Sequence, residues 1–136
     1  MNNPASISGG CLCSAVRYRA EEPLWVAHCH CRSCRLASGA AFTTFAGFAR
    51  QSLVYLSGQP ALFESSPGVH RGFCARCGSS LTYQSDRWPD EVHILIATTD
   101  APEALEPQAH VYCAEKLPWI HLDDGLPQHP GTSNPD

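Results

Sequence analysis

The chain has 136 residues, of which 43% are hydrophobic and 16% charged, and these values predict one globular domain with a thin core. Its formal net charge of −4, with 9 Lys and Arg residues spread over the whole chain, argues against a nucleic-acid partner. No apolar run approaches the roughly 20 residues that a membrane helix needs, and residues 1–10 show no leader pattern, so we expect a cytosolic protein without a membrane partner.

Short apolar runs between turn residues predict a mainly β domain over residues 8–122. We expect strands or apolar runs at 12–20, 24–27, 41–48, 53–56, 61–63, 69–73, 80–84, 92–98 and 109–113, with helical turns at 32–38 and 102–105. Gly39 is expected to close the first helical turn. Residues 1–7 are expected to form a flexible lead-in and residues 123–136 a flexible tail, because polar and turn-forming residues dominate both.

Seven of the eight cysteines fall into three closely spaced groups, which are Cys11 with Cys13, Cys29 with Cys31 and Cys34, and Cys74 with Cys77. In a reducing compartment, such spacing indicates metal ligation. A C-x-x-C turn directs two thiolates at one ion, and C-x-C on a strand places both side chains on one face. Disulfides and buried free thiols do not explain three clusters, and iron–sulfur ligation is the other metal alternative.

The two isolated pairs together supply the four protein ligands of a structural zinc, namely Cys11, Cys13, Cys74 and Cys77. The middle group supplies only three, Cys29, Cys31 and Cys34, and three ligands with one open position are typical of a catalytic zinc. We therefore predict two zinc ions per chain. A fourth protein ligand would close the second site, and the candidates are Cys113, His28, His30 or another histidine.

The other polar candidates have a structural interpretation that we favour. His28 and His30 alternate with the ligating cysteines, so their side chains are expected to face away and to support or pack. Cys113 is expected to be a buried thiol, and Arg32 with Arg35 a solvated turn that can also attract a small anion. The possible pocket residues, which the sequence does not rank, are Tyr18, Tyr83, Tyr112, His93 and His110, although core histidines are the default for the last two.

Four motifs in this order resemble one known family, and they are Gly10-Cys11-x-Cys13-x-x-Val16-x-Tyr18, His28-Cys29-His30-Cys31-x-x-Cys34-Arg35, Arg71-x-Phe73-Cys74-x-x-Cys77-Gly78 and Leu117-Pro118-Trp119. Over residues 8–122 the chain resembles the glutathione-dependent formaldehyde-activating enzymes, a family that includes centromere protein V. The resemblance implies a β-tent fold of small antiparallel sheets and the same division of seven cysteines between two zinc ions. Ser14 stands where many relatives have Gly, and Cys113 lies outside the family's cysteine pattern.

The activity that the resemblance implies is the addition of glutathione to formaldehyde, giving S-(hydroxymethyl)glutathione, which is classed as a carbon–sulfur lyase reaction in reverse. An open zinc permits this chemistry because it polarises an aldehyde oxygen or lowers the pKa of a bound thiol. We expect an enzyme of this type that acts on a small thiol–aldehyde adduct through Cys29, Cys31 and Cys34. Arg32 and Arg35 are the candidates for holding a glutathione carboxylate. The alternatives are a zinc-stabilised binding module without catalysis, and a redox enzyme resembling the methionine sulfoxide reductases, with Cys113 as its reactive thiol.

Overall fold

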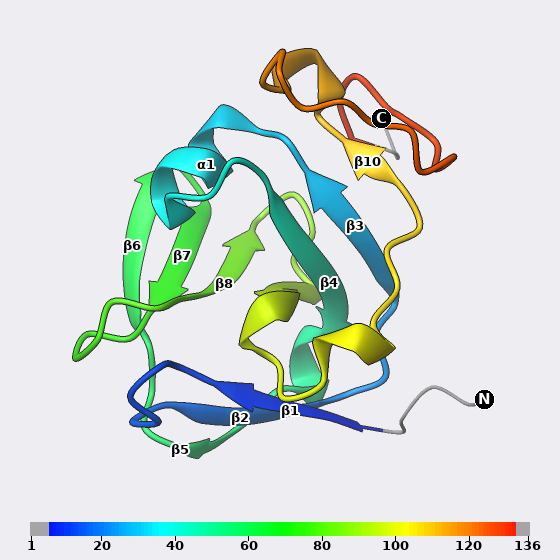
Figure 1. Cartoon of the computed structure of the whole chain (residues 1–136). Coiled ribbons are helices and arrows are strands. Elements are labelled where there is room, and N and C mark those ends of the chain that lie inside the picture. The colour runs from blue at the N-terminus through cyan, green and yellow to red at the C-terminus, as the bar shows by residue number, and fades with distance from the viewer. Residues whose placement is uncertain (1–5, 133–136) are drawn as a thin grey trace.

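The protein is mainly β, as predicted, in a computed structural model that describes residues 6–132 (Figure 1). A small antiparallel sheet has the strand order β1-β2-β5, and a seven-stranded sheet has the order β10-β3-β4-β9-β8-β7-β6. The strands are β1 (Ser6–Gly10), β2 (Arg17–Glu21), β3 (Trp25–Cys29), β4 (Thr43–Ala49), β5 (Val54–Ser57), β6 (Ala61–Ser66), β7 (Val69–Phe73), β8 (Ser80–Ser85), β9 (Glu91–Leu95) and β10 (His110–Val111). The larger sheet is mixed, because β10 pairs parallel to β3 whereas its other pairs are antiparallel.

The one α-helix of the described residues is α1 (Arg32–Ser38), which coincides with the predicted helical turns. It ends at Gly39, whose φ of 76° lets its N–H donate to the carbonyl of Arg35 at 2.7 Å, as a left-handed glycine cap does. The 3₁₀ turns are η1 (Arg50–Ser52), η2 (Ile96–Thr98), η3 (Pro102–Ala104) and η4 (Cys113–Glu115). Within residues 6–132, no helix is long and apolar enough to cross a membrane.

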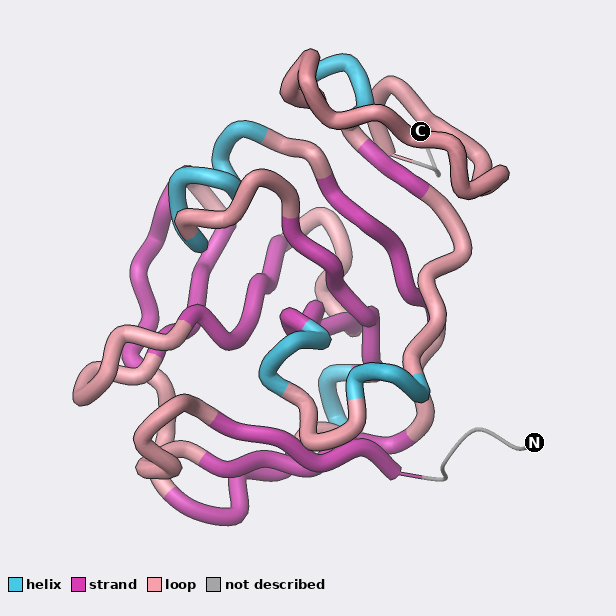
Figure 2. The backbone as a smooth tube through the Cα atoms, viewed as in Figure 1, coloured by secondary structure: helices cyan, strands magenta, loops and turns pink. Residues whose placement is uncertain are grey.

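The main core lies where the small sheet packs against the large one, and Figure 2 shows the small sheet as a layer across the bottom of the molecule. Its largest fully buried side chains include Tyr18 from β2, Phe48 from β4 and Ile94 from β9. Tyr18 shares a 2.7 Å hydrogen bond with Thr98, which satisfies its buried hydroxyl. Tyr18 is therefore a core residue and not the pocket residue that the sequence left possible.

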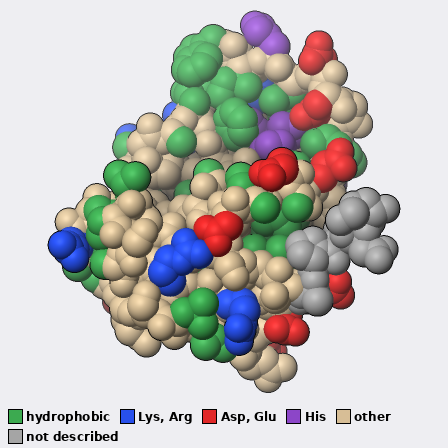
Figure 3. Space-filling view, turned by 60° about the horizontal axis from the view of Figure 1, so that its bottom comes forward, with side chains coloured by type: hydrophobic (Ala, Val, Ile, Leu, Met, Phe, Trp, Pro, Cys, Tyr) green, Lys and Arg blue, Asp and Glu red, His purple; other side chains and the backbone are tan. Residues whose placement is uncertain are grey.

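The face of the molecule in Figure 3 carries scattered charges. Its Lys and Arg side chains are not gathered into one basic patch, and acidic side chains lie among them. Arg17 and Asp100 form an ion pair. Two guanidinium nitrogens of Arg17 donate to the two carboxylate oxygens of Asp100 at 3.0 and 2.6 Å. This pair joins β2 to the segment after η2.

The first expected strand, at 12–20, is wrong in its first part. The structure has a tight turn over residues 11–16 between β1 and β2, closed by a 3.0 Å hydrogen bond from the N–H of Cys11 to the carbonyl of Val16. Ser14 has a φ of 66°, which is the left-handed region that glycine adopts without strain. The turn requires this conformation at Ser14. The alternation of polar and apolar side chains, from which the strand is expected, does not predict it.

The described part of the expected tail, residues 123–132, lies beside β10 (Figure 1). The N–H of His110 donates to the carbonyl of Pro127, and the N–H of His129 donates to the carbonyl of His110, both at 2.9 Å. These bonds fasten the segment to the edge of the large sheet. Residues 1–5 and 133–136 of the expected lead-in and tail lie outside the described residues, and β1 begins at Ser6.

Candidate metal and catalytic sites

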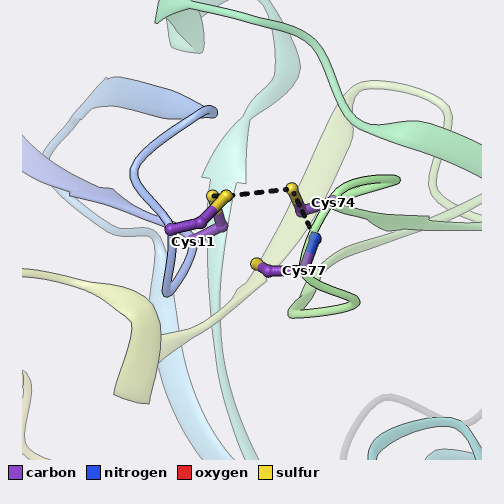
Figure 4. A group of neighbouring side chains, drawn as sticks. Cys11, Cys74 and Cys77 are labelled. Carbon is purple, nitrogen blue, oxygen red and sulfur yellow. Dashed lines mark hydrogen bonds between the residues drawn. The ribbon is translucent and has the colours of Figure 1, made fainter.

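The turn after β1 and the knuckle between β7 and β8 bring four thiols together (Figure 4). Their Sγ atoms all lie within 4.8 Å of one another, and the residues are Cys11, Cys13, Cys74 and Cys77. The sulfur of Cys13 is 3.7 Å from that of Cys11 and 3.8 Å from that of Cys74. Sulfurs about 2.3 Å from a tetrahedral zinc are about 3.8 Å apart, so the four thiols fit this ion in number, type and spacing.

Two sulfur atoms of this cluster, those of Cys74 and Cys77, take part in hydrogen bonds. The hydroxyl of Ser79 lies 3.2 Å from the sulfur of Cys77 and, with the Ser79 N–H, lowers the pKa of Cys77 to about 5. The Cys77 N–H also donates to the sulfur of Cys74 at 3.4 Å. Gly78 closes the knuckle at a φ of 82°, with a 2.7 Å bond to the carbonyl of Cys74. These contacts favour the thiolate form of Cys77 before any metal is considered.

The second cysteine group gathers at the junction of β3 and α1. Cys29 ends β3, Cys31 precedes α1, and Cys34 lies in the first turn of α1. The sulfurs of Cys29 and Cys34 are 3.9 Å apart and both side chains are buried. Hydrogen bonds from Cys29 and then Cys34 lower the pKa of Cys31, whereas the contact with Cys31 raises the pKa of Cys29. Cys31 interacts with both of these thiols and is the one favoured as the thiolate. The groups of the described residues whose ligand atoms all lie within 4.8 Å of one another do not include these three cysteines.

A cavity of about 370 Å³ opens against this three-cysteine group and is within the size range of small-molecule sites. All three cysteines line it. Its walls also contain the aromatic side chains of Trp25, Tyr83, Trp88, His93 and Tyr112. His28, His30 and Cys113, which the sequence offered as closing ligands, are not among the lining residues. The thiols therefore face a space that a small ligand can enter.

Glu91 lines the cavity and contacts two of its aromatic side chains. Its Oε1 accepts a hydrogen bond from Trp25 Nε1 at 3.2 Å and lies 2.9 Å from His93 Nε2. Burial lowers the pKa of His93 and outweighs the neighbouring carboxylate of Glu91. His93 is then neutral near pH 7, with Nε2–H donating to Glu91 and Nδ1 left as a proton acceptor. The sequence predicted a hydrogen-bonded core histidine at this position, and the structure adds that its ring lines the cavity.

Arg71 on β7 is the functional candidate that the sequence analysis did not single out. Its Nη1 lies 3.6 Å from the sulfur of Cys34, its Nε donates to Ser65 Oγ at 3.2 Å, and its guanidinium lies 5.0 Å from the ring centre of Tyr83. Its only signal in the sequence is its place three residues before Cys74, in a motif read for its cysteines. Arg71 reaches the cavity because β7 pairs with β8, and the sequence does not specify this pairing residue by residue.

The two arginines proposed from the sequence lie elsewhere. The main-chain N–H of Arg32 donates to Glu115 Oε1 at 2.8 Å, and Arg35 Nη2 donates to the carbonyl of Glu115 at 3.3 Å. Neither residue lines the cavity. Ser33 and Cys34 are the residues of α1 that line the cavity, whereas the side chain of Arg35 contacts η4.

A histidine cluster forms a second group of possible metal ligands. One ligand atom each of His28, His110 and Asp124 lies within 4.8 Å of the others. His110 uses both ring nitrogens in hydrogen bonds, because Nε2 lies 2.8 Å from Asp124 Oδ2 and Nδ1 lies 3.0 Å from His30 Nε2. Asp124 falls within the stretch expected to be a tail, so the sequence gives no signal of its place in this cluster. His110 thus belongs to this cluster and not to the cavity, where the sequence left it possible.

The fold and these thiol groups define a small, mainly β protein with clustered cysteines that can hold metal. The family model described as glutathione-dependent formaldehyde-activating enzyme matches residues 6–115, and the chain belongs to this family.

The relatives found agree with this membership. A Halomonas elongata protein, provisionally named a glutathione-dependent formaldehyde-activating enzyme, is 28% identical over 128 residues, which cover 86% of this chain and 81% of that protein. An uncharacterised lyase of Schizosaccharomyces pombe is 34% identical over 77 residues, or 55% of each chain. The crystal structure of a Rhodobacter sphaeroides protein has the same fold, with a TM-score of 0.58 at 22% identity over 90% of this chain and 98% of that one.

Proposed function

We propose that the chain is a zinc-dependent enzyme that adds a small thiol to an aldehyde, such as glutathione to formaldehyde, and cleaves the same carbon–sulfur bond in reverse. The observation that carries this proposal is the cavity lined by Cys29, Cys31 and Cys34. Membership of the family and the names of the two relatives support the same chemistry. The proposed cofactors are two zinc ions, one at this cavity and one at the four-cysteine cluster.

The residues of each site have distinct proposed roles. The four thiols around Cys74 would hold a structural ion, since they leave no open position. The three thiols at the cavity would hold the second ion and leave one position for the substrate. A zinc ion bound there supplies an electrophilic centre that favours the thiolate form of a bound thiol and polarises an aldehyde oxygen.

Addition forms a sulfur–carbon bond, turns the carbonyl into a hydroxyl group and moves the thiol proton to that oxygen, so no oxidant or reductant takes part. His93 is the proposed acceptor of the thiol proton, because burial keeps it neutral and Nδ1 is free of the bond to Glu91. Tyr112 is the proposed donor toward the new oxygen, because burial raises the pKa of its hydroxyl and it therefore stays protonated. The proton taken up by His93 is then released to solvent, and the Tyr112 phenolate takes one up, so that both residues return to their starting state. The φ of 56° at Tyr112 is the kind of backbone strain that accumulates at functional sites.

The proposal is tested by measuring the exchange between glutathione, formaldehyde and their adduct by NMR in the presence of zinc-loaded protein. We expect an exchange rate that increases with protein concentration and falls to the spontaneous rate in Cys34→Ser. Cys113→Ser is the matched control and should retain the activity, because Cys113 does not line the cavity. If folded, zinc-loaded protein leaves the spontaneous rate unchanged with every thiol tested, the enzymatic function is wrong and a binding module is favoured.

A further inference from the structure

The cavity has one basic end. Among the described residues that line it, Arg71 is the only lysine or arginine. Two of its five N–H groups are directed at Ser65 and Cys34, and within residues 6–132 it forms no ion pair with a carboxylate. Three donors of a permanently charged group are thus left for a ligand.

The guanidinium of Arg71 is also held in place before any ligand binds. The ring of Tyr83 lies beneath it, and that ring is stacked in turn on His93 with centroids 5.4 Å apart. A fixed, planar cation of this kind is suited to two parallel hydrogen bonds with a carboxylate. Because less side-chain freedom is lost on binding, such a contact contributes more to affinity than a mobile lysine would.

Arg71 also lines two adjoining cavities. A second cavity, of about 530 Å³, adjoins the first, and both are lined by Ser33, Cys34, Phe45, Ser65 and Arg71. Its other walls include the apolar side chains of Leu36, Phe63, Phe73 and Leu95. A ligand anchored at Arg71 has room for a body several atoms long, which formaldehyde by itself does not need.

We propose that Arg71 binds a carboxylate of the thiol substrate while the substrate sulfur lies at the three cysteines. This inference rests on the proposed function and assigns the residue that recognises its substrate class, a thiol that also carries a carboxylate, as glutathione does. The 3.6 Å between Arg71 Nη1 and Cys34 Sγ places the anion site beside the sulfur site. Arg71 is a specificity-determining residue in this scheme.

The test compares two ligands that each contain one half of the recognised group. S-methylglutathione has carboxylates but no free thiol, and its affinity is measured by calorimetry. 2-Mercaptoethanol has a thiol but no carboxylate, and its affinity is measured from the absorbance of the cobalt-substituted protein. We expect Arg71→Met to weaken S-methylglutathione binding roughly tenfold or more, as the loss of a charged hydrogen bond does, with little change for 2-mercaptoethanol.

Two further variants make the comparison decisive. Arg50→Met removes an exposed arginine outside both cavities and should leave both affinities unchanged. Arg71→Lys keeps the charge without the planar fork, so S-methylglutathione should bind with intermediate affinity, and this variant replaces Arg71→Met if the latter fails to load cobalt.

Three results would overturn the proposal: no binding of S-methylglutathione to the native protein, unchanged binding to the Arg71 variants, or equal weakening of both ligands. The last result would mean that Arg71 acts only through Cys34. The proposed function fails separately, if no thiol alters the cobalt spectrum of the native protein. Binding of S-methylglutathione requires no free thiol, so the two failures are distinguishable.

Discussion

The side chain that links the cavity to the stability of the fold is His93. It is 8% exposed, packs edge-on against Trp25 with ring centroids 4.6 Å apart, and hydrogen-bonds to Glu91. Protonation of a ring in such surroundings moves a charge into a low-dielectric site, and burial accordingly lowers the pKa of His93. The same burial that makes His93 a neutral proton acceptor therefore makes the fold sensitive to acid.

We expect His93 to contribute to the loss of stability as the pH falls. Its pKa in the folded protein is below the unfolded value of about 6.5, so the unfolded chain takes up the proton first. The stabilisation is complete above about pH 6.5 and declines as the pH falls below it. Urea unfolding at pH 7, 6 and 5 should show a shallower decline for His93→Gln than for the native protein. The exposed His121→Gln is the control, and parallel curves for all three proteins would refute the assignment.

Gly47 on β4 is a second residue on which the cavity depends. A Cβ atom added there would lie 2.3 Å from Trp25 Cε2, and Trp25 is opposite Gly47 in the β3–β4 pairing. The indole therefore rests on bare backbone, and this position brings Trp25 Nε1 to Glu91.

We predict that Gly47→Ala displaces this indole and destabilises the protein by about 1–3 kcal/mol, the usual range for overpacking. Urea unfolding and the tryptophan emission spectrum measure the two effects. Gly131→Ala is the matched control, because a Cβ there meets no atom within 4 Å, and a change within about 0.5 kcal/mol is expected. A Gly47→Ala protein as stable as the control would contradict this role of Gly47.

At the scale of elements, the two ends of the large sheet are completed by different means. One end is formed by β6, next to the β7–β8 hairpin with its cysteine knuckle, and the other is formed by β10 with residues 123–132 beside it. The segment is attached through main-chain bonds and through the carboxylate of Asp124, whose pKa is lowered by the hydrogen bond with His110. Thr132 of this segment lines the cavity, so the attachment bears on the candidate site.

We expect Asp124→Ala to loosen this segment. Its amide hydrogens should exchange faster than in the native protein, whereas those of β7 and β8 should not change, and hydrogen-exchange mass spectrometry resolves the two regions. Metal content should stay the same, because both nitrogens of His110 already serve protein hydrogen bonds. Loss of one metal per chain from Asp124→Ala would instead identify the cluster of His28, His110 and Asp124 as an occupied metal site.

The sequence predicts well those elements whose structure is determined by residues close together in the chain. Gly39 ends α1 where a left-handed cap requires it, and the C-x-x-C knuckle lies between β7 and β8 as expected. The features that the sequence does not predict are those that depend on distant segments. The turn around Ser14 brings its thiols to partners beyond residue 70, and the tail finds its bonds on β10. Arg71 reaches the cavity through strand pairing, which residue type does not reveal.

At the scale of the whole molecule, the four-cysteine cluster lies between the small sheet and the large one. The four-cysteine cluster joins the turn after β1 to the β7–β8 hairpin, and its members Cys13 and Cys74 are separated by 61 residues. A metal there would tie the small sheet to the large one, because it would stabilise only the folded arrangement. The three-cysteine group lies in a separate apolar cluster, with Phe45, and lines the cavity. We therefore expect removal of the first metal to unfold the chain and removal of the second to spare it.

The central claim is that Cys29, Cys31 and Cys34 hold an exchangeable metal beside the cavity. The most direct measurement is the metal content of the native protein and of Cys31→Ser, with thiol titration of both in cobalt-substituted form. We predict two metals per chain in the native protein and one in the folded variant, with a cobalt spectrum that thiols shift only in the native protein. Two metals retained by Cys31→Ser, or a native cobalt spectrum that no thiol alters, would contradict the account.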